Sequence, residues 1–175
     1  MKLKQSHKIA LILLSLVLFV TWIECEQRFV VTGRVVDATT GKPVEGASIA
    51  IHWSGTHIAA MFVPYASGTY LIENAKATSD KDGYFEIPKY FLKSFYMGVY
   101  KKGHVCWSSN RIFLKGGKRT KRIWFWVRPG MTIKLEPMTS EYPRFEHASF
   151  VIAVSSASGG LEGTGEEIKY FKERY

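Results

Sequence analysis

The sequence predicts an all-β domain: a seven-stranded antiparallel Greek-key sandwich that carries a short helical C-terminal extension. Between residues 28 and 136, short stretches alternate apolar and polar residues as half-buried strands do, and turn signals separate them about every 8–12 residues. The aromatic content is 14%, which favours sheets over a helical bundle. A chain of 175 residues with 46% hydrophobic content can bury one substantial core.

The predicted strands follow one another along residues 28–137. The stretch RFVVTGRVVD (28–37) alternates, and glycine- and proline-containing turn residues lead to ASIAIHW (47–53), which alternates again. A less regular link at 54–72 is too long for a tight hairpin. Further strands are predicted near residues 73–78, 84–87, 95–101, 112–115, 121–127 and 131–137.

One turn raises the question of a metal site. The stretch ATSDKDGYFEIP contains Asp80, Asp82 and Gly83, the middle of a calcium loop, but Thr78 stands where the first carboxylate should be. A helix should follow a calcium loop of this type, and Pro88 makes one unfavourable. We therefore expect Asp80 to Gly83 to form a hairpin turn that binds no metal, and we expect no cofactor.

The segment after Pro137 differs in character. RFEHASFVIAVSSA reads as a short helix, or as a strand if its apolar run dominates, and SASGGLEGTG reads as a flexible linker. GEEIKYFKERY is a terminal helix with acidic residues near its start and basic residues near its end. We divide the chain into residues 1–25, a sandwich at 26–137 and an extension at 138–175.

The N-terminus predicts export. Three lysines precede the apolar run IALILLSLVLFV, as in a secretory signal, and the run is short for a transmembrane helix. Three fates stay open for residues 1–25: cleavage after Cys25, acylation of Cys25 as in a bacterial lipoprotein, or retention as an anchor. We place the protein in the periplasm or cell envelope, associated with the membrane. Cys106 is interpreted as a small buried apolar residue, although it could pair with a retained Cys25.

Three motifs together resemble the carboxypeptidase regulatory-like domain family. They are a G-x-V-x-D strand, a G-x-P-x-x-G-A turn and a T-x-D-x-D-G-x-F turn, carried by Gly33, Val35, Asp37, Gly41, Pro43, Gly46, Ala47, Thr78, Asp80, Asp82, Gly83 and Phe85. The resemblance covers roughly residues 29 to 103 and implies a transthyretin-like, seven-stranded sandwich. It also implies a bacterial source. It implies no single function, because such domains accompany peptidases, receptors and adhesins.

Catalytic signatures are missing from the sequence. No histidine is followed three residues later by glutamate, so the chain lacks the zinc motif of a metallocarboxypeptidase, and no G-x-S-x-G elbow or phosphate loop occurs. His52 and His57 without a carboxylate or thiolate partner are a weak metal site. A small hydrolase would need a site in the 54–72 insert.

Two features indicate binding. No acidic residue lies between Glu86 and Glu136, where lysines and arginines recur, and the sequence pI is about 9.5. In an exported protein, such a surface suits a membrane surface, an acidic polysaccharide or an acidic envelope protein, whereas nucleic acid does not fit the compartment. The second feature is a stripe on one face of the predicted strand KRIWFWVR, formed by Arg122, Trp124, Trp126 and Arg128.

These features give one function and two alternatives. We predict an exported, non-catalytic accessory or binding domain of the cell envelope, with its basic half facing a membrane surface. In the first alternative, a carbohydrate-binding module stacks sugar rings on Trp124 and Trp126. Against this alternative, the C-terminal segment could cover these tryptophans. Against the membrane-facing basic surface, the basic residues could merely solvate strand edges. The second alternative is the hydrolase.

Overall fold

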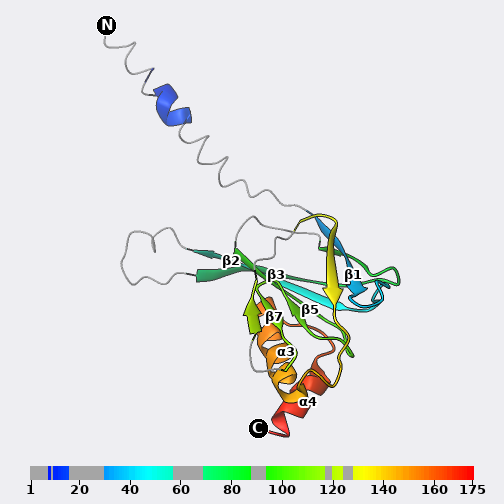
Figure 1. Cartoon of the computed structure of the whole chain (residues 1–175). Coiled ribbons are helices and arrows are strands. Elements are labelled where there is room, and N and C mark those ends of the chain that lie inside the picture. Colours follow the sequence, from blue (N-terminus) through cyan, green and yellow to red (C-terminus); the bar gives the residue numbers. More distant parts are fainter. Residues whose placement is uncertain are drawn as a thin grey trace.

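The computed structural model describes residues 8, 10–15, 30–56, 69–87, 94–116, 120–123 and 128–175. From residue 30 onward, the described residues form nine strands followed by two helices (Figure 1). The strands are β1 (Val31–Asp37), β2 (Ser48–Thr56), β3 (Thr69–Thr78), β4 (Tyr84–Ile87), β5 (Ser94–Tyr100), β6 (Trp107–Ser108), β7 (Arg111–Phe113), β8 (Thr120–Arg122) and β9 (Met131–Leu135). The helices are α3 (Arg144–Ser158) and α4 (Gly165–Lys172).

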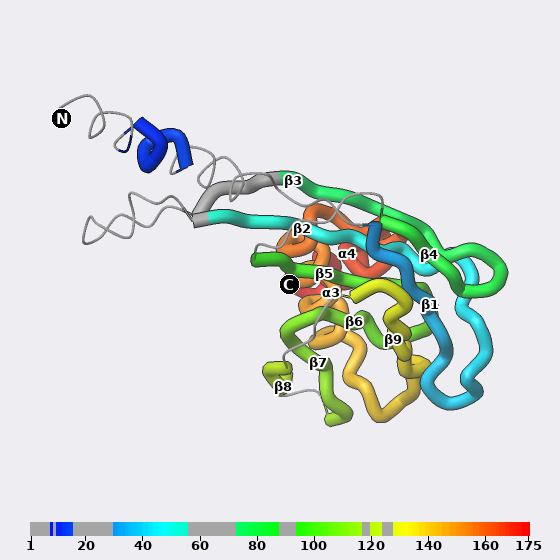
Figure 2. The backbone as a smooth tube through the Cα atoms, turned by 90° about the horizontal axis from the view of Figure 1, so that it is seen from above, coloured from blue at the N-terminus to red at the C-terminus, as the bar shows by residue number. Residues whose placement is uncertain are grey.

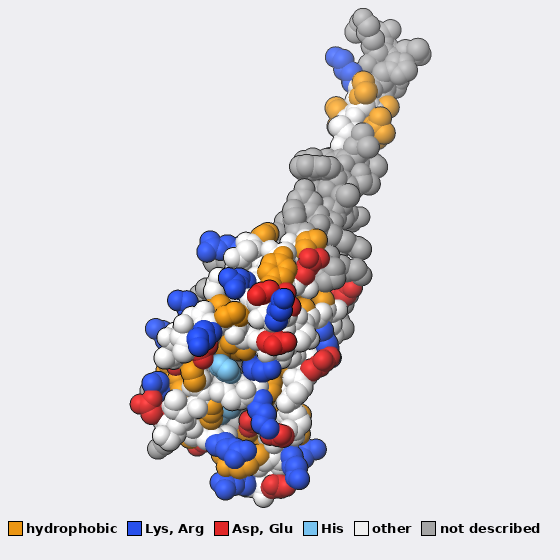
Figure 3. All heavy atoms as spheres, turned by 90° about the vertical axis from the view of Figure 1, so that its right-hand side faces the viewer, with side chains coloured by type: hydrophobic (Ala, Val, Ile, Leu, Met, Phe, Trp, Pro, Cys, Tyr) orange, Lys and Arg blue, Asp and Glu red, His pale blue; other side chains and the backbone are white. Residues whose placement is uncertain are grey.

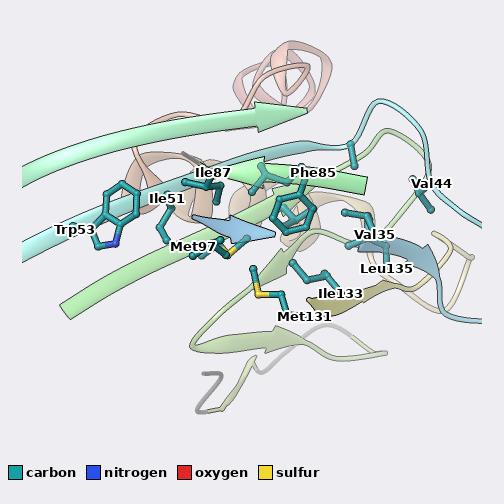
Figure 4. Packing of buried hydrophobic residues seen from close by; sticks show 14 residues of the cluster. Val35, Val44, Ile51, Trp53, Phe85, Ile87, Met97, Met131, Ile133 and Leu135 are labelled. Carbon is teal, nitrogen blue, oxygen red and sulfur yellow. The ribbon is translucent and has the colours of Figure 1, made fainter. Parts of the chain in front are cut away.

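Two sheets form a sandwich. One has three strands in the order β4-β1-β9, and the other has four in the order β3-β2-β5-β6. Their facing sides share one core, to which β1, β4 and β9 contribute from one sheet and β2 and β5 from the other (Figure 4). Trp53, Phe85 and Ile133 are among its fully buried side chains. The predicted β-sandwich is therefore confirmed.

Two details of the prediction are wrong. The described residues form nine strands, not seven: β6 was not predicted, and β7 and β8 make a separate two-stranded ribbon beside the two main sheets. The sandwich is also not wholly antiparallel: β9 runs parallel to β1, with Gly33 opposite Met131 and Asp37 opposite Leu135. The chain reaches β9 only after passing through the other sheet, so β9 enters beside β1 from the same end.

Burial explains why most strands show alternating apolar and polar residues in the sequence, whereas the predicted strand β5 does not. In β9, buried Met131, Ile133 and Leu135 alternate with exposed residues, as expected for a strand with one wet face. In β5, four successive residues from Met97 to Tyr100 are buried. Alternation is lost there because β5 is covered on both sides, by the sandwich core and by a helical layer.

That helical layer is the C-terminal segment. Helix α3 packs on the outer side of β5 and β2, and a second core joins Ala50 and Tyr100 of the sheet to Phe150, Val151 and Val154 of the helix. Figure 2 shows α3 lying against the four-stranded sheet, with α4 beside it. The helical alternative is thus confirmed for this segment. The extension is not short, however, because α3 alone has 15 residues.

A glycine lets the helix come this close. A Cβ added to Gly98 in β5 would lie 2.7 Å from Cγ1 of Val154 and 3.0 Å from Oγ of Ser158. Any side chain at this position would therefore push α3 away from the sheet. The helix ends at Gly159, whose φ is 90°.

The N-terminal segment is described only at residues 8 and 10–15, where the backbone is helical and Leu11 and Ile12 are largely exposed. In the described part of the chain, no helix combines the length and the apolar character that crossing a membrane requires. The possible cleavage or acylation at Cys25 lies outside the described residues.

Candidate functional site

The sequence-predicted stripe is only partly described. Arg122 is the last residue of β8 and is exposed, and Arg128 is exposed just before the turn at Pro129 and Gly130. Trp124 and Trp126 lie outside the described residues. In the described part of the chain, the C-terminal helix α3 covers β2 and β5.

The structure places a second arginine, Arg111, opposite Arg122, and the sequence analysis did not predict this pairing. Strands β7 and β8 pair antiparallel, with Arg111 opposite Arg122 and Ile112 opposite Lys121. All three basic side chains on this ribbon are exposed. A signal existed in the sequence: if the glycines of KGGK (115–118) are taken as the centre of a hairpin, Arg111 falls opposite Arg122.

The three basic residues of the ribbon have no acidic partner in the described part of the chain. Elsewhere, Lys102 pairs with Glu166 at 2.7 Å and Lys115 with Glu141 at 2.5 Å. No described carboxylate lies within ion-pair distance of Arg111, Lys121 or Arg122. Only two acidic residues of the whole chain fall outside the described ranges, Glu24 and Glu26. The ribbon is therefore a concentration of uncompensated positive charge.

This imbalance is local. Figure 3 looks at the right-hand side of Figure 1, and acidic and basic side chains lie side by side over the visible face. The ion pairs Lys102–Glu166 and Lys115–Glu141 are themselves largely exposed, so each contributes little to stability. The Lys115 ammonium lowers the pKa of the Glu141 carboxyl below its usual value, through a hydrogen bond and through its charge.

A polar network fixes the base of the ribbon. The hydroxyl groups of Ser108 and Tyr96 are 2.9 Å apart, and the Asn110 backbone N–H donates to Oγ of Ser108 at 3.4 Å. Burial raises the pKa of the Tyr96 phenol, and the hydrogen bond with Ser108 and, less strongly, the nearby charge of Arg111 partly offset that rise. On the same ribbon, the Phe113 ring packs 5.4 Å from that of Phe150 on α3. The position of β7 is thus set by both the sheet and the helix.

The family-like motif residues lie together and serve the fold. The first motif strand, β1, pairs with β4, which places Gly33 opposite Phe85. The Val35 N–H donates to the Gly83 carbonyl at 2.7 Å, and the Val44 N–H donates back to the Val35 carbonyl at 3.0 Å. The three motifs therefore meet around β1, where they join the turns to the sandwich.

The Asp80 turn differs from the expected hairpin. Strand β3 before the turn and strand β4 after it belong to different sheets, so the turn carries the chain across the sandwich. Oδ1 of Asp80 accepts the N–H groups of Asp82 and Tyr84 at 2.9 and 2.8 Å. Hairpin turns and crossing turns use the same residue types, and the pairing of β4 with β1 decides between them.

Asp37 and His104 form a second contact between distant segments. Oδ1 of Asp37 accepts the backbone N–H groups of Thr39 and Thr40 at 2.9 and 2.7 Å, and the Thr40 contact lowers the pKa of the carboxyl. Oδ2 lies 3.3 Å from Nε2 of His104. The carboxylate is thus occupied in fixing the turn after β1 and the loop after β5.

Cys106 and His147 meet in the second core. The Cys106 backbone N–H donates to Nε2 of His147 at 3.0 Å, and both residues are 1% exposed. Burial raises the pKa of the thiol and lowers that of the imidazole to about 4. Both side chains are therefore neutral at neutral pH, and the thiol is not a ready nucleophile. The interpretation of Cys106 as a small buried residue is confirmed.

Among the described residues, no three His, Cys, Asp or Glu side chains are arranged to hold a metal ion. Most of the 54–72 insert, residues 57–68 with His57, lies outside those residues, and so does any hydrolase site placed in it. His52 is described in β2, opposite Asn74 and Tyr96.

The fold and the site define a class: a β-sandwich with a helical outer layer and a cationic ribbon. No family model matches the sequence, and no curated protein matches it. Among solved structures, the chain is similar to the C-terminal domain of the shaft pilin SpaA from Lactobacillus rhamnosus GG. The identity is 16% and the TM-score 0.35, over 65% of this chain and 100% of that one. It is also similar to a 9R-lipoxygenase from Cyanothece, with 17% identity and a TM-score of 0.29, over 66% of this chain and 17% of that one. Neither similarity is close enough to assign a family or an activity.

Proposed function

We propose that this chain is an exported, non-catalytic β-sandwich domain of the cell envelope, which lies at a membrane surface and binds it through the β7–β8 ribbon. The observation that carries the proposal is the cluster of exposed Arg111, Lys121 and Arg122, which has no described carboxylate in ion-pair distance. The apolar N-terminal run supplies the other half of the argument, since a signal or anchor directs the domain to the envelope.

The expected binding free energy fits a peripheral contact with a membrane surface. A Lys or Arg close to an anionic membrane surface adds about 1 kcal/mol of binding free energy. Lys121 lies on the opposite face of the ribbon from the two arginines, so about two of the three can approach a surface together. A gain of about 2 kcal/mol is a weak attachment by itself. It becomes effective when an N-terminal anchor already holds the domain near the membrane.

The non-catalytic part of the proposal is supported by what the polar groups do. The carboxylates of Asp37 and Asp80 accept backbone N–H groups in turns, and Cys106 and His147 are buried in neutral form. The residues of the motifs that resemble the carboxypeptidase regulatory-like family have a structural role in this chain, because they join turns to β1. Such a role fits an accessory domain of that kind.

Vesicle sedimentation tests the membrane proposal. The full chain is mixed with vesicles of phosphatidylcholine alone or with added phosphatidylglycerol, at low and high salt. We expect binding to the anionic vesicles at low salt, and loss of most of it when Arg111, Lys121 and Arg122 are all replaced by Gln. The matched control replaces three exposed lysines elsewhere, Lys42, Lys81 and Lys134, and removes the same charge.

The outcomes separate the parts of the proposal. Equal losses in the two triple variants would contradict a role for the ribbon and indicate a general effect of net charge. Binding that survives high salt would indicate the N-terminal segment alone, because salt screens exposed charges. A protein that is fully soluble after gentle lysis of its own cells at low salt would refute membrane residence.

A further inference from the structure

We infer that Arg111 and Arg122 together form a binding site for a phosphate-type oxyanion, either the phosphate of a lipid headgroup or free phosphate. The inference rests on the ribbon proposed above as the membrane-binding element, and it names the chemical group that the ribbon holds.

The register brings the two arginines as close as strand geometry allows. The Ile123 N–H donates to the Asn110 carbonyl at 2.9 Å, so Asn110 and Ile123 are a hydrogen-bonded pair. Hydrogen-bonded and non-hydrogen-bonded pairs alternate along an antiparallel ladder. Arg111 and Arg122 are the next pair and hence non-hydrogen-bonded, the class in which Cα atoms are about 4.5 Å apart and side chains are closest.

Two guanidinium groups at such a position repel each other unless an anion lies between them. Like charges directly opposite on a ladder are destabilising, and a two-stranded ribbon of three-residue strands has little stability of its own. Among the described residues no carboxylate is placed to neutralise the pair. The counter-charge therefore comes from outside the described chain. A guanidinium presents a planar fork of N–H donors that matches the oxygens of a phosphate.

The backbone that carries Arg111 is held in place before any anion binds. Asn110 is tied to Ser108 and through it to Tyr96 of β5, and Phe113 is buried against α3. Arg111 lies between these two fixed points. Because it shares a face of β7 with Phe113, the arginine pair faces the side of the ribbon on which α3 lies. Both arginines are exposed there, so an anion reaches them directly.

Phosphate titration of the full chain tests the site. Melting temperature and calorimetric binding are measured in phosphate and in chloride at matched ionic strength, for the wild type, Arg111→Gln, Arg122→Gln, the double variant and Lys121→Gln. The last is the matched control, because it removes one charge from the same ribbon on the opposite face. A second arm replaces free phosphate by vesicles that contain phosphatidic acid.

We expect each arginine variant to weaken phosphate binding at least tenfold, the double variant to add little more, and Lys121→Gln to change binding less than threefold. In chloride, Arg111→Gln is expected to raise the melting temperature, because it removes repulsion, while it abolishes the rise that phosphate causes. A higher melting temperature in chloride together with the loss of the phosphate-induced rise distinguishes loss of a binding site from loss of folding.

The other outcomes have definite meanings. Equal weakening by Lys121→Gln, or no phosphate response in the wild type, would overturn the site while leaving general binding to anionic vesicles untouched. Phosphate binding that depends on both arginines, without binding to phosphatidic acid vesicles, would support the site for free phosphate and count against the membrane proposal. Pair-dependent binding in both arms would identify the lipid headgroup as the source.

Discussion

Acid should loosen this fold through His147. The side chain lies under α3 with 1% exposure, Nε2 accepts the Cys106 N–H, and the Phe113 ring packs edge-on at 5.5 Å. In the described part of the chain, Nδ1 has no hydrogen-bond partner. Burial disfavours the charged form and lowers the pKa from 6.5 to about 4. A proton on Nε2 would also break the bond from Cys106.

The size of the effect follows from linkage. A pKa of 6.5 in the unfolded chain against about 4 in the folded one means that the unfolded chain binds the proton more tightly. The stability that this group contributes is present above pH 6.5 and is lost as the pH falls towards 4. At about 1.36 kcal/mol per pKa unit, the full loss is about 3 kcal/mol, and most of it occurs by pH 4.5.

The carboxyl groups whose pKa values are lowered titrate below the pH range in which His147 acts. The pKa values of Asp37, Glu141 and Glu166 are also lowered, from ordinary values of 3.8 and 4.5, so their contributions are lost only at more acidic pH. Between pH 6.5 and 4.5 the fall in stability should therefore be dominated by His147.

Urea denaturation at a series of pH values measures this loss. Tryptophan fluorescence reports the sandwich, where Trp53 is buried, and far-UV circular dichroism reports the helices. We expect the wild type to lose about 2.5 kcal/mol between pH 7.5 and 4.5. His147→Gln should lose far less, because its amide oxygen can still accept the Cys106 N–H and does not titrate. His104→Gln is the control and should keep the acid slope. A flat wild-type profile, or an unchanged slope in His147→Gln, would refute the burial argument.

Three further predictions concern the fold. Gly98→Ala should cost about 1–3 kcal/mol by crowding Val154, and adding Val154→Ala should recover part of that loss in a double-mutant cycle; purely additive losses would contradict the packing of α3 on β5. Gly83→Ala should cost about 2 kcal/mol or more, because φ is 74° and the new Cβ would lie 2.4 Å from the Val35 carbonyl oxygen; near-wild-type melting would argue against this turn. Calcium should leave the melting temperature unchanged, because Oδ1 of Asp80 already binds two backbone N–H groups; a rise of several degrees would reveal a metal site.

Several strands could be predicted from the sequence because their pattern depends only on residues within the strand. Strands β1, β4 and β9 were predicted because their side chains alternate between core and solvent, and one solvent-exposed face leaves that alternation visible in the sequence. The short β6 was missed because two residues are too few to show a period. The two-sided burial of β5 was missed because its cause, α3, lies about fifty residues further along the chain.

In the candidate site too, the sequence revealed a feature of a single strand but not the residue that lies opposite it. Arg122 was singled out from the sequence as part of a stripe on one strand, and its neighbours in that stripe, Trp124 and Trp126, lie outside the described residues. Arg111 was counted only as one of many basic residues. Its place opposite Arg122 depends on a ladder, and composition contains no information about which residues face each other across it.

By itself, the sequence determined the β-sandwich, the turn positions and the acid-free basic half, and it predicted an export signal, since each depends on neighbouring residues and on the period of side-chain alternation. Only the tertiary structure decided that the Asp80 turn crosses between sheets and that β9 runs parallel to β1. It also decided that α3 covers the four-stranded sheet. These three features are pairings between distant segments. Their free energy comes from surfaces buried together, and no local pattern records which surfaces those are.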